Sequence, residues 1–309
     1  MKRRKFIISS GIIGTLLPVS DILSMNERKF KISLNPGSIG VKYNMNDLLK
    51  MAIKYKYEAI SPNIYKLENY NQEDSQKFIK KMNIKNISWD VAGLPINFRE
   101  KKETFLDHLK NLEKHCKTMN KFGINKLSTW IMPTNQDLTY FDNFKLHSKR
   151  LKTIAEIIKD YNIKLGLEYV GVRTLMNRDK YPFIHTIKEL KNLVENIGYS
   201  NIGYQLDSFH WYCSEDRLED YNFLNNNNII TVDLNDAVYG RTRKNQIDFE
   251  RELPSKSKVI DLKKFINFLI EVGYSGSVRA EPFNKKLNDM DDEKAVELTF
   301  NSLFETINL

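Results

Sequence analysis

Eight short apolar runs alternate with segments of helical periodicity, and this alternation constrains the fold more than any other feature of the chain. The runs are predicted strands, at residues 30–34, 57–61, 86–93, 126–132, 164–170, 202–207, 229–235 and 276–283. Apolar residues recur at three- and four-residue spacing between and after them, for example at 48–55, 151–161, 186–197, 262–274 and 293–307. Strands that alternate with helices form a parallel sheet covered by those helices.

The number of strands favours a closed barrel over an open sheet. An open doubly wound sheet usually has fewer strands, and the glycine-rich phosphate turn of such sheets is absent from this sequence. Eight strand–helix units match a single (β/α)8 TIM barrel in the α/β class, for which about 250 residues is typical. No Pro-, Gly- or Ser-rich linker divides the 309 residues. We therefore expect one catalytic barrel domain over residues 29–309.

The N-terminal segment differs in character from the rest of the chain. Basic residues at positions 2–5 precede an apolar run over residues 6–19. This run is too short for a membrane span, which needs about 20 apolar residues. It is typical of an export signal, and the adjacent Arg3 and Arg4 indicate the twin-arginine route. We therefore expect residues 1–28 to be a signal segment and the protein to be exported to the periplasm; a packed N-terminal helix is the alternative.

Charge and cysteine content narrow the classes of function. Forty-eight Lys and Arg against 39 Asp and Glu give a formal net charge of +9, but no block of five or six like charges occurs. This pattern favours a solvated surface over a nucleic-acid interface, so no nucleic-acid partner is expected. Cys116 and Cys213 cannot form a disulfide framework, although one bridge is conceivable. We expect both to pack as free thiols.

Carboxylates occupy the ends of four successive predicted strands. Glu168 ends LGLE, Asp207 ends YQLD, Asp233 lies in TVDLND and Glu281 ends VRAE. In a barrel the carboxyl ends of the strands meet at one rim, where active sites are built. Four acids gathered there would repel one another until protons or a cation relieved the charge. A divalent metal is the simplest solution, with carboxylate oxygens as ligands and open positions for water and substrate.

Two further side chains join this cluster by their spacing. His210 follows Asp207 by three residues, and its imidazole suits contact with a substrate hydroxyl or proton shuttling. Arg279 shares the inward face of its strand with Glu281, because side chains alternate, and would supply a cation or a buried partner. Taken singly, each acid has a structural explanation; Asp207, for example, could cap the next helix. Four acids at four successive strand ends favour a site.

These motifs resemble the sugar phosphate isomerase/epimerase family, the xylose isomerase-like barrels. The resemblance covers the chain after the signal segment. It rests on LGLEYVG (165–171), LDSFHWY (206–212), DLNDA (233–237) and GYSGSVRAEPF (273–283), which follow one another in the family's order. The chain also resembles an exported subgroup of this family, at GLP (93–95), FR (98–99), RELP (251–254) and VIDLKKFI (259–266).

The resemblance implies a divalent ion held by Glu, Asp, His and Glu, commonly Mn²⁺ and in some members Co²⁺, Mg²⁺ or Zn²⁺. The matching positions are Glu168, Asp207, Asp233 and Glu281, so an aspartate replaces the family's histidine. This replacement adds a negative charge and an oxygen donor, which favours Mn²⁺ or Mg²⁺ over Zn²⁺. It leaves open that Asp233 lies outside the ligand set, or that the chain binds metal poorly.

The family chemistry is proton transfer beside a carbonyl, so the resemblance predicts a sugar or keto-sugar isomerase or epimerase that works through an enediolate. Glu168 and Glu281 would remove and return the proton on opposite faces of the substrate, while the metal polarises its oxygens. His210 would hold a substrate oxygen. Further candidates for substrate contacts are Trp211, Arg279 and, on a long loop over residues 237–258, Arg251.

Three alternatives stay open. Proton removal beside a ketone can expel a leaving group, so the same site would serve a lyase on 3-keto-glycosides or a dehydratase on keto-inositols. A non-catalytic sugar-binding barrel would result if Asp233 had cost the chain its metal. A nuclease on this barrel would need several histidines from different strands, yet of five histidines only His210 stands at a strand end within a motif. A small carbohydrate is the expected partner, and homo-oligomerisation is left open.

Overall fold

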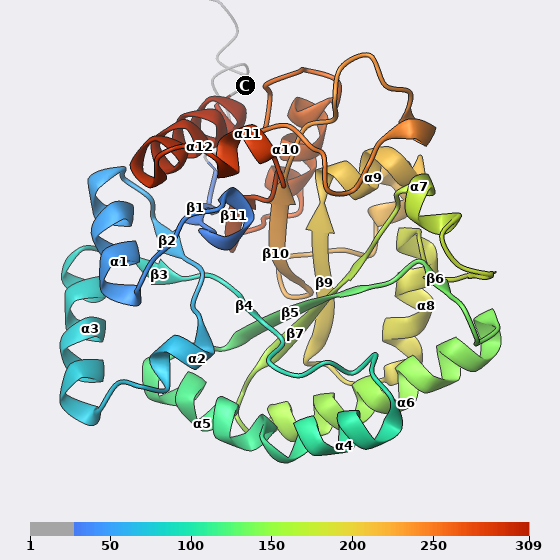
Figure 1. The fold of residues 1–309 in the computed structure, drawn as a ribbon, viewed down its shortest axis with the longest axis horizontal. Helices are drawn as coiled ribbons and strands as arrows, with labels where there is room; N and C mark the ends of the chain where they lie inside the picture. The colour runs from blue at the N-terminus through green and yellow to red at the C-terminus, as the bar shows by residue number, and fades with distance from the viewer. Residues whose placement is uncertain (1–27, 309) are drawn as a thin grey trace, which may run out of the picture.

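The computed structural model describes residues 28–308 of the chain. The predicted export signal therefore lies outside the described residues, except for Arg28. Figure 1 shows a central sheet surrounded by helices, with the C-terminal helix α12 beside strands β1 and β11. The last helix thus packs against the first strand, as expected of a barrel whose first and last units meet.

Within the described residues, nine strands form one sheet in which every pair is parallel. They are β1 (Lys31–Leu34), β2 (Ala59–Ile60), β3 (Ser88–Trp89), β4 (Ala92–Gly93), β5 (Lys126–Ile131), β7 (Lys164–Tyr169), β9 (Ile202–Asp207), β10 (Ile229–Leu234) and β11 (Ser277–Ala280). Their order is β3-β2-β1-β11-β10-β9-β7-β5-β4. A separate antiparallel pair consists of β6 (Thr134–Asn135) and β8 (Tyr181–Pro182).

The strand region at residues 86–93 closes the sheet. β3 and β4 stand at opposite ends of the sheet order, yet only Asp90 and Val91 separate them in the chain. One extended segment therefore pairs with β2 at one end and with β5 at the other. This arrangement confirms the predicted single (β/α)8 barrel. Each of the eight predicted strand regions contains an observed strand, and only the region over residues 86–93 is split in two.

Helices connect the strands, and the longer helices cover their outer side. They are α1 (Met45–Lys54), α2 (Ile64–Leu67), α3 (Gln72–Ile84), α4 (Lys102–Lys110), α5 (Leu112–Phe122), α6 (Tyr140–Lys159), α7 (Arg173–Met176), α8 (Ile187–Ile197), α9 (Ser208–Ser214), α10 (Leu262–Glu271), α11 (Lys285–Asn288) and α12 (Asp292–Ile307). Short 3-10 turns lie at Gly37–Ile39, Leu218–Tyr221 and Arg243–Asn245.

The five predicted helical segments are all observed, but α6 begins well before the predicted residue 151. Thr139 caps its first turn with a side chain that accepts from the backbone N–H of Asp142. The early turns bury polar residues, among them His147 and Arg150, and these carry no apolar periodicity. The apolar pattern therefore detected only the second half of this helix.

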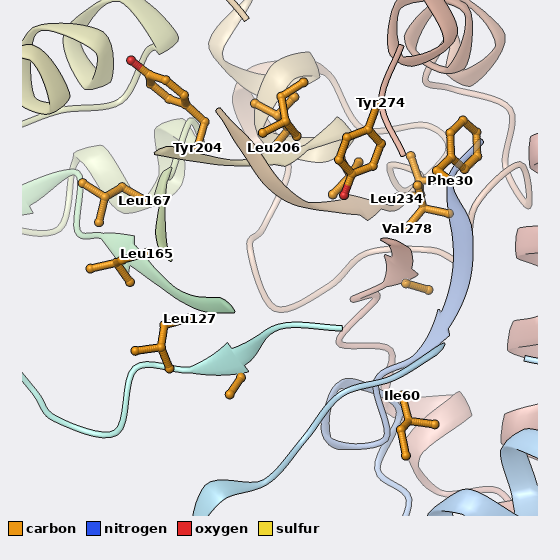
Figure 2. Packing of buried hydrophobic residues seen from close by; sticks show 14 of the residues in the cluster. Phe30, Ile60, Leu127, Leu165, Leu167, Tyr204, Leu206, Leu234, Tyr274 and Val278 are labelled. Carbon is orange, nitrogen blue, oxygen red and sulfur yellow. The ribbon is translucent and has the colours of Figure 1, made fainter. Parts of the chain in front are cut away.

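The core lies between the strands and the helices, because alternate strand residues face outward. Leu165 and Leu167 of β7 and Leu206 of β9 are buried in this layer. Figure 2 shows their side chains on the helix-facing side of the strands. The intervening residues, such as Gly166 and Glu168, consequently face the inside of the barrel. This alternation turns the strand-end acids toward one another.

Both cysteines lie in this core. Cys116 and Cys213 are buried and free, as predicted, and burial raises the pKa of each thiol to about 12. Neither thiol is therefore poised for thiolate chemistry near neutral pH.

Among the helices of residues 28–308, none combines the length and the apolar character that crossing a membrane requires.

Candidate active site

A cavity of about 720 Å³ opens at the carboxyl ends of the strands. Its inner wall is formed by residues that end or follow strands β7, β9 and β11 and by one loop residue: Glu168, Gln205, His210, Arg279, Glu281 and Arg251. Volumes of roughly 300–1,000 Å³ are typical of small-molecule sites. The position matches the rim at which barrel enzymes carry out their chemistry.

The strand register brings the four predicted acids to this rim. Asp207 of β9 is aligned with Asp233 of β10, which is aligned with Arg279 of β11. Glu168, Asp207 and Asp233 are each at most 4% exposed. Ligand atoms of two sets lie within 4.8 Å of one another, and these sets are Glu168–Asp207–His210 and Glu168–Asp233–Glu281. Side chains from four strand ends therefore converge on one place.

Asp233 is bound by an arginine inside the barrel. Arg279 donates from Nε to Oδ1 of Asp233 at 2.7 Å and from Nη2 to Oδ2 at 3.1 Å. Gln205 donates to the same Oδ2 at 2.8 Å and to Oε1 of Glu168 at 3.0 Å. Arg279 is thus the buried partner that strand alternation predicted. Its guanidinium donates to both carboxylate oxygens of Asp233, and Arg279 also lines the cavity.

Asp207 is bound by a second arginine, which comes from the loop after β10. Arg251 is 2% exposed and donates from Nη1 to Oδ2 of Asp207 at 2.7 Å and from Nη2 to Oδ1 of Asp248 at 2.7 Å. Its Nη1 also lies 3.7 Å from Oε2 of Glu281. The loop at residues 237–258 therefore brings Arg251 to the site, and the Arg251 side chain lies deep in the acid cluster. Three carboxylates compensate for the burial of its charge.

The opening turn of α9 gives Asp207 two roles at once. Its Oδ1 accepts from the backbone N–H of Phe209 at 2.7 Å and so caps the helix, while Oδ2 faces Arg251.

His210 is 1% exposed, and its Nε2 lies 3.4 Å from Nη2 of Arg251 and 3.8 Å from Oδ1 of Asp248. Burial lowers the pKa of His210, so the ring is neutral at neutral pH. A neutral imidazole can both donate and accept.

Of the four acids, the two glutamates have no arginine within hydrogen-bond distance of their carboxylates. Oε2 of Glu168 and both side-chain oxygens of Glu281 accept no hydrogen bond from residues 28–308. Burial, followed by the charges of Glu281 and Asp207, raises the pKa of Glu168 well above its usual range. Burial and then the charge of Asp233 raise the pKa of Glu281 to about 8. Protons or a cation are needed to keep this pair together.

Charge counting shows what kind of cation fits. Glu168, Asp207, Asp233 and Glu281 carry four negative charges, and Arg251 and Arg279 carry two positive charges. The formal surplus of these six groups is −2, and Asp248, which shares Arg251 with Asp207, makes it −3. Glu168 belongs to both sets of possible ligand atoms, and Glu281 belongs to one of them. The residues thus fit a divalent metal, which would offset part of the negative charge that the two arginines leave.

The three tryptophans lie in different surroundings, and Trp211 is not where a substrate contact would need it. Trp211 does not line the cavity: its ring packs on Phe265 of α10, with 5.3 Å between ring centroids. Neighbours on a helix point about 100° apart, so the turn that aims His210 at the cavity aims Trp211 at the outer layer. Trp89 stacks on Phe78 in the core. Trp130 is the one of the three that lines the cavity.

Three buried polar residues of the site were not predicted. Gln205 precedes Asp207 by two residues, and Asn235 follows Asp233 by two, so strand alternation could have identified both. Asn235 donates to both oxygens of Asp207 at 3.1 Å and accepts from the backbone N–H of Glu281 at 2.8 Å. Asp248 lies in a loop, and no periodic signal marks it. Its contact with Arg251 depends on how that loop folds.

Comparison with known proteins agrees with this geometry. The profile of the xylose isomerase-like TIM barrels matches residues 49–303. The chain is similar to the inosose isomerase of Halalkalibacterium halodurans, with 25% identity over 162 residues, which is 51% of this chain and 53% of that protein. It is similar to the inosose isomerase of Bacillus subtilis, with 23% identity over 196 residues, 62% and 65% of the two chains. The matches thus span about half and just under two thirds of these relatives.

Solved structures show the same fold. A xylose isomerase domain protein of Alicyclobacillus acidocaldarius superposes with a TM-score of 0.79 at 24% identity, over 90% of this chain and 98% of that one. The IolI protein with a bound zinc atom gives 0.76 at 18%, over 90% and 98%. D-psicose 3-epimerase gives 0.66 at 16%, over 89% and 98%. The probable 3-DHS dehydratase of Bacillus anthracis gives 0.66 at 14%, over 89% and 99%.

Proposed function

The chain belongs to the xylose isomerase-like TIM barrel family, and on this premise we propose that it is a metal-dependent isomerase or epimerase of a sugar or keto-sugar. One observation carries the proposal. Three of the four carboxylate oxygens of Glu168 and Glu281 accept no hydrogen bond from residues 28–308, and both side chains line the cavity and belong to one set of ligand atoms within 4.8 Å. The names of the two curated relatives, both inosose isomerases, support a keto-sugar or keto-inositol as the substrate class.

In this proposal the two glutamates move the proton beside the substrate carbonyl. They project from strands β7 and β11, which are separated by β9 and β10, and so reach a ligand between them from different sides. Without a bound ion, burial raises the pKa of Glu281 to about 8, so this carboxyl can carry a proton near neutral pH. Glu168, whose pKa burial raises well above its usual range, is restrained by Gln205. His210 holds a substrate oxygen.

The metal in this proposal is a divalent ion held by the acid cluster. Glu168 and Glu281 would offer their unpaired oxygens, and Asp207 and Asp233 would each share a carboxylate with an arginine. When bound, such an ion supplies Lewis acidity beside the substrate carbonyl. An all-oxygen donor set favours Mn²⁺ or Mg²⁺, whereas His210 as a nitrogen donor would admit Zn²⁺ or Co²⁺. We propose Mn²⁺ as the resident ion.

The proposal is tested by proton exchange and metal content together. Purified protein, with its metals measured by elemental analysis, is incubated with inososes and ketohexoses in D₂O, and deuterium beside the carbonyl is followed by NMR. Glu168→Gln and Glu281→Gln should each lower exchange by about 10²-fold or more, since each removes a general acid–base group. Glu297→Gln, on the exposed side of α12, is the matched control. Undiminished exchange in both site variants would refute the proposed roles.

A lyase or dehydratase is the second candidate. Elimination needs a third group at the leaving oxygen; His210, whose Nε2 lies 3.8 Å from Oδ1 of Asp248, could hydrogen-bond that oxygen when neutral and protonate it only as the imidazolium. Product analysis on 3-keto-glycosides separates the two activities, because a lyase releases the aglycone and an epimerase returns a keto-glycoside. A protein that contains no divalent ion and is not stabilised by added Mn²⁺ would instead support a non-catalytic sugar-binding barrel.

A further inference from the structure

The cavity continues past the acid cluster to side chains that the proposed reaction does not use. Its outer wall, toward the loops after β4 and β5, includes Tyr65, Arg99, His108, Trp130 and Arg178. Trp130 of β5 is the register partner of Glu168 of β7, so this wall begins one strand away from the proposed proton-transfer group. A cavity of this size suits a drug-sized ligand, which is larger than a single sugar ring. The outer wall is therefore available to a second part of the substrate.

Arg99 carries an uncompensated charge in this wall. Its guanidinium donates to Oγ1 of Thr129 at 2.7 Å, to Oδ1 of Asn97 at 3.3 Å and to the carbonyl of Trp130. All three acceptors are neutral, and within residues 28–308 no carboxylate forms an ion pair with it. Burial lowers the pKa of Arg99 to about 10, with no acid near enough to oppose the effect. Its Nε has no hydrogen-bond partner among the described residues.

The other arginines of the cavity differ in this respect. Arg251 and Arg279 are each paired with a buried aspartate, and Arg178 is paired with Asp179 at 2.8 Å. Arg99 is half-buried, and a guanidinium withdrawn from water without a counter-ion gains from an anion that a ligand supplies. Among the four arginines of the cavity wall, Arg99 is consequently the one whose charge a ligand can balance.

Aromatic contacts fix the orientation of Arg99. Its guanidinium carbon lies 3.8 Å from the ring centroid of Trp130 and 4.5 Å from that of Phe98. Such contacts hold the planar fork in place. Of its five N–H groups, one on Nη1 and the buried one on Nε form no hydrogen bond with residues 28–308. Trp130 remains 42% exposed, so part of the indole is open to a ligand.

Building on the proposed function, we propose that Arg99 and Trp130 form an anion-binding subsite and that the substrate carries a carboxylate or a phosphate away from its reacting carbon. The in-plane N–H groups of a guanidinium match the oxygens of either group. The substrate class is thereby narrowed to anionic keto-sugars, that is, sugar acids or sugar phosphates.

Binding of matched sugars tests the subsite. D-glucuronate, D-glucose 6-phosphate and neutral D-glucose are titrated into the full protein, loaded with Mn²⁺, by ligand-observed NMR. We expect at least one anionic sugar to bind roughly ten-fold more tightly than glucose; which one it is distinguishes a carboxylate from a phosphate. Arg99→Met should abolish the preference and leave glucose affinity within about two-fold. Arg178→Met is the matched control, since it removes a charge that Asp179 already balances, and should keep the preference.

Three results would overturn the inference: no preference for either anion, an equal loss of preference in Arg178→Met, or an equal weakening of glucose and the anions in Arg99→Met. The last result would mean that Arg99 only holds the Trp130 segment, and Arg99→Lys, which keeps the charge, would then restore nothing. Proton exchange on neutral keto-sugars reports separately on the proposed function. If the parent protein showed no proton exchange but kept the anion preference, the reaction alone would be refuted. Proton exchange without an anion preference would refute the subsite alone.

Discussion

The pair formed by Asp233 and Arg279 can be tested by removing each partner and then both. Arg279→Met leaves Asp233 buried with only Gln205 as a donor, and Asp233→Asn leaves the Arg279 guanidinium without its bidentate acceptor. Both residues are at most 6% exposed, so solvent cannot replace the lost partner. Each single variant therefore breaks a buried pair, which typically costs about 3–5 kcal/mol.

The double variant Asp233→Asn with Arg279→Met has a different outcome. It removes both charges together, and exchange of a buried pair for neutral groups of similar size is often close to neutral in stability. In the double-mutant cycle the two single losses should thus exceed the loss in the double variant by about 3 kcal/mol or more. At roughly 2 °C per kcal/mol for a domain of this size, each single variant should melt about 6–10 °C lower than the parent.

The assay is thermal and urea unfolding of the metal-free protein, with EDTA present throughout so that ion binding does not contribute. Far-UV circular dichroism at 25 °C establishes that each variant is folded before it is melted. Additive losses in the double variant would contradict the pairing. So would an Arg279→Met protein that is as stable as the parent, because the guanidinium would then not be compensating Asp233.

Three further predictions follow from the same geometry. Between pH 4.5, the ordinary pKa of glutamate, and about pH 8, Glu281 holds a proton in the folded protein but not in the unfolded chain. The Tm of the metal-free protein should therefore fall as pH rises from 5 to 8.5. Added Mn²⁺ should reduce this fall, and differential scanning calorimetry would measure both effects. Trp130→Ala should raise KM several-fold, while Trp211→Phe should lower Tm by a few degrees at unchanged KM, because Trp211 packs on Phe265 away from the cavity; equal KM effects would contradict this placement. If residues 1–28 direct export by the twin-arginine route, replacing Arg3 and Arg4 by Lys should retain the protein in the cytoplasm, and periplasmic recovery of this variant in cell fractionation would rule that route out.

Much of the fold was predictable because it depends on local patterns. Short apolar runs marked every strand region and period-3.6 hydrophobicity marked five of the helices, because both patterns express which residues meet the core. Where burial is polar, the prediction weakened. The early turns of α6 bury His147 and Arg150, and the helix therefore begins 11 residues before the predicted 151, at Tyr140.

The candidate site was predictable to the level of its acids. Glu168, Asp207 and Glu281 were identified because parallel strands end at one rim, and the structure brings their side chains together there. The role of Trp211 could not be predicted in the same way. Its sequence neighbour His210 faces the cavity, but a single helical step turns Trp211 to α10, and only the packing of α9 on the barrel decides which of the two points inward.

What the amino-acid sequence determined by itself is the barrel and the rim of carboxylates, since both follow from repeating intervals along the chain. What only the tertiary structure decided is how those charges are balanced. Arg251 reaches Asp207 across 44 positions in sequence, and Arg279 reaches Asp233 across 46. Such pairings depend on strand register and on the path of a non-periodic loop, and no local interval encodes either. The same holds for Arg99, whose unbalanced charge is apparent only when its surroundings are known.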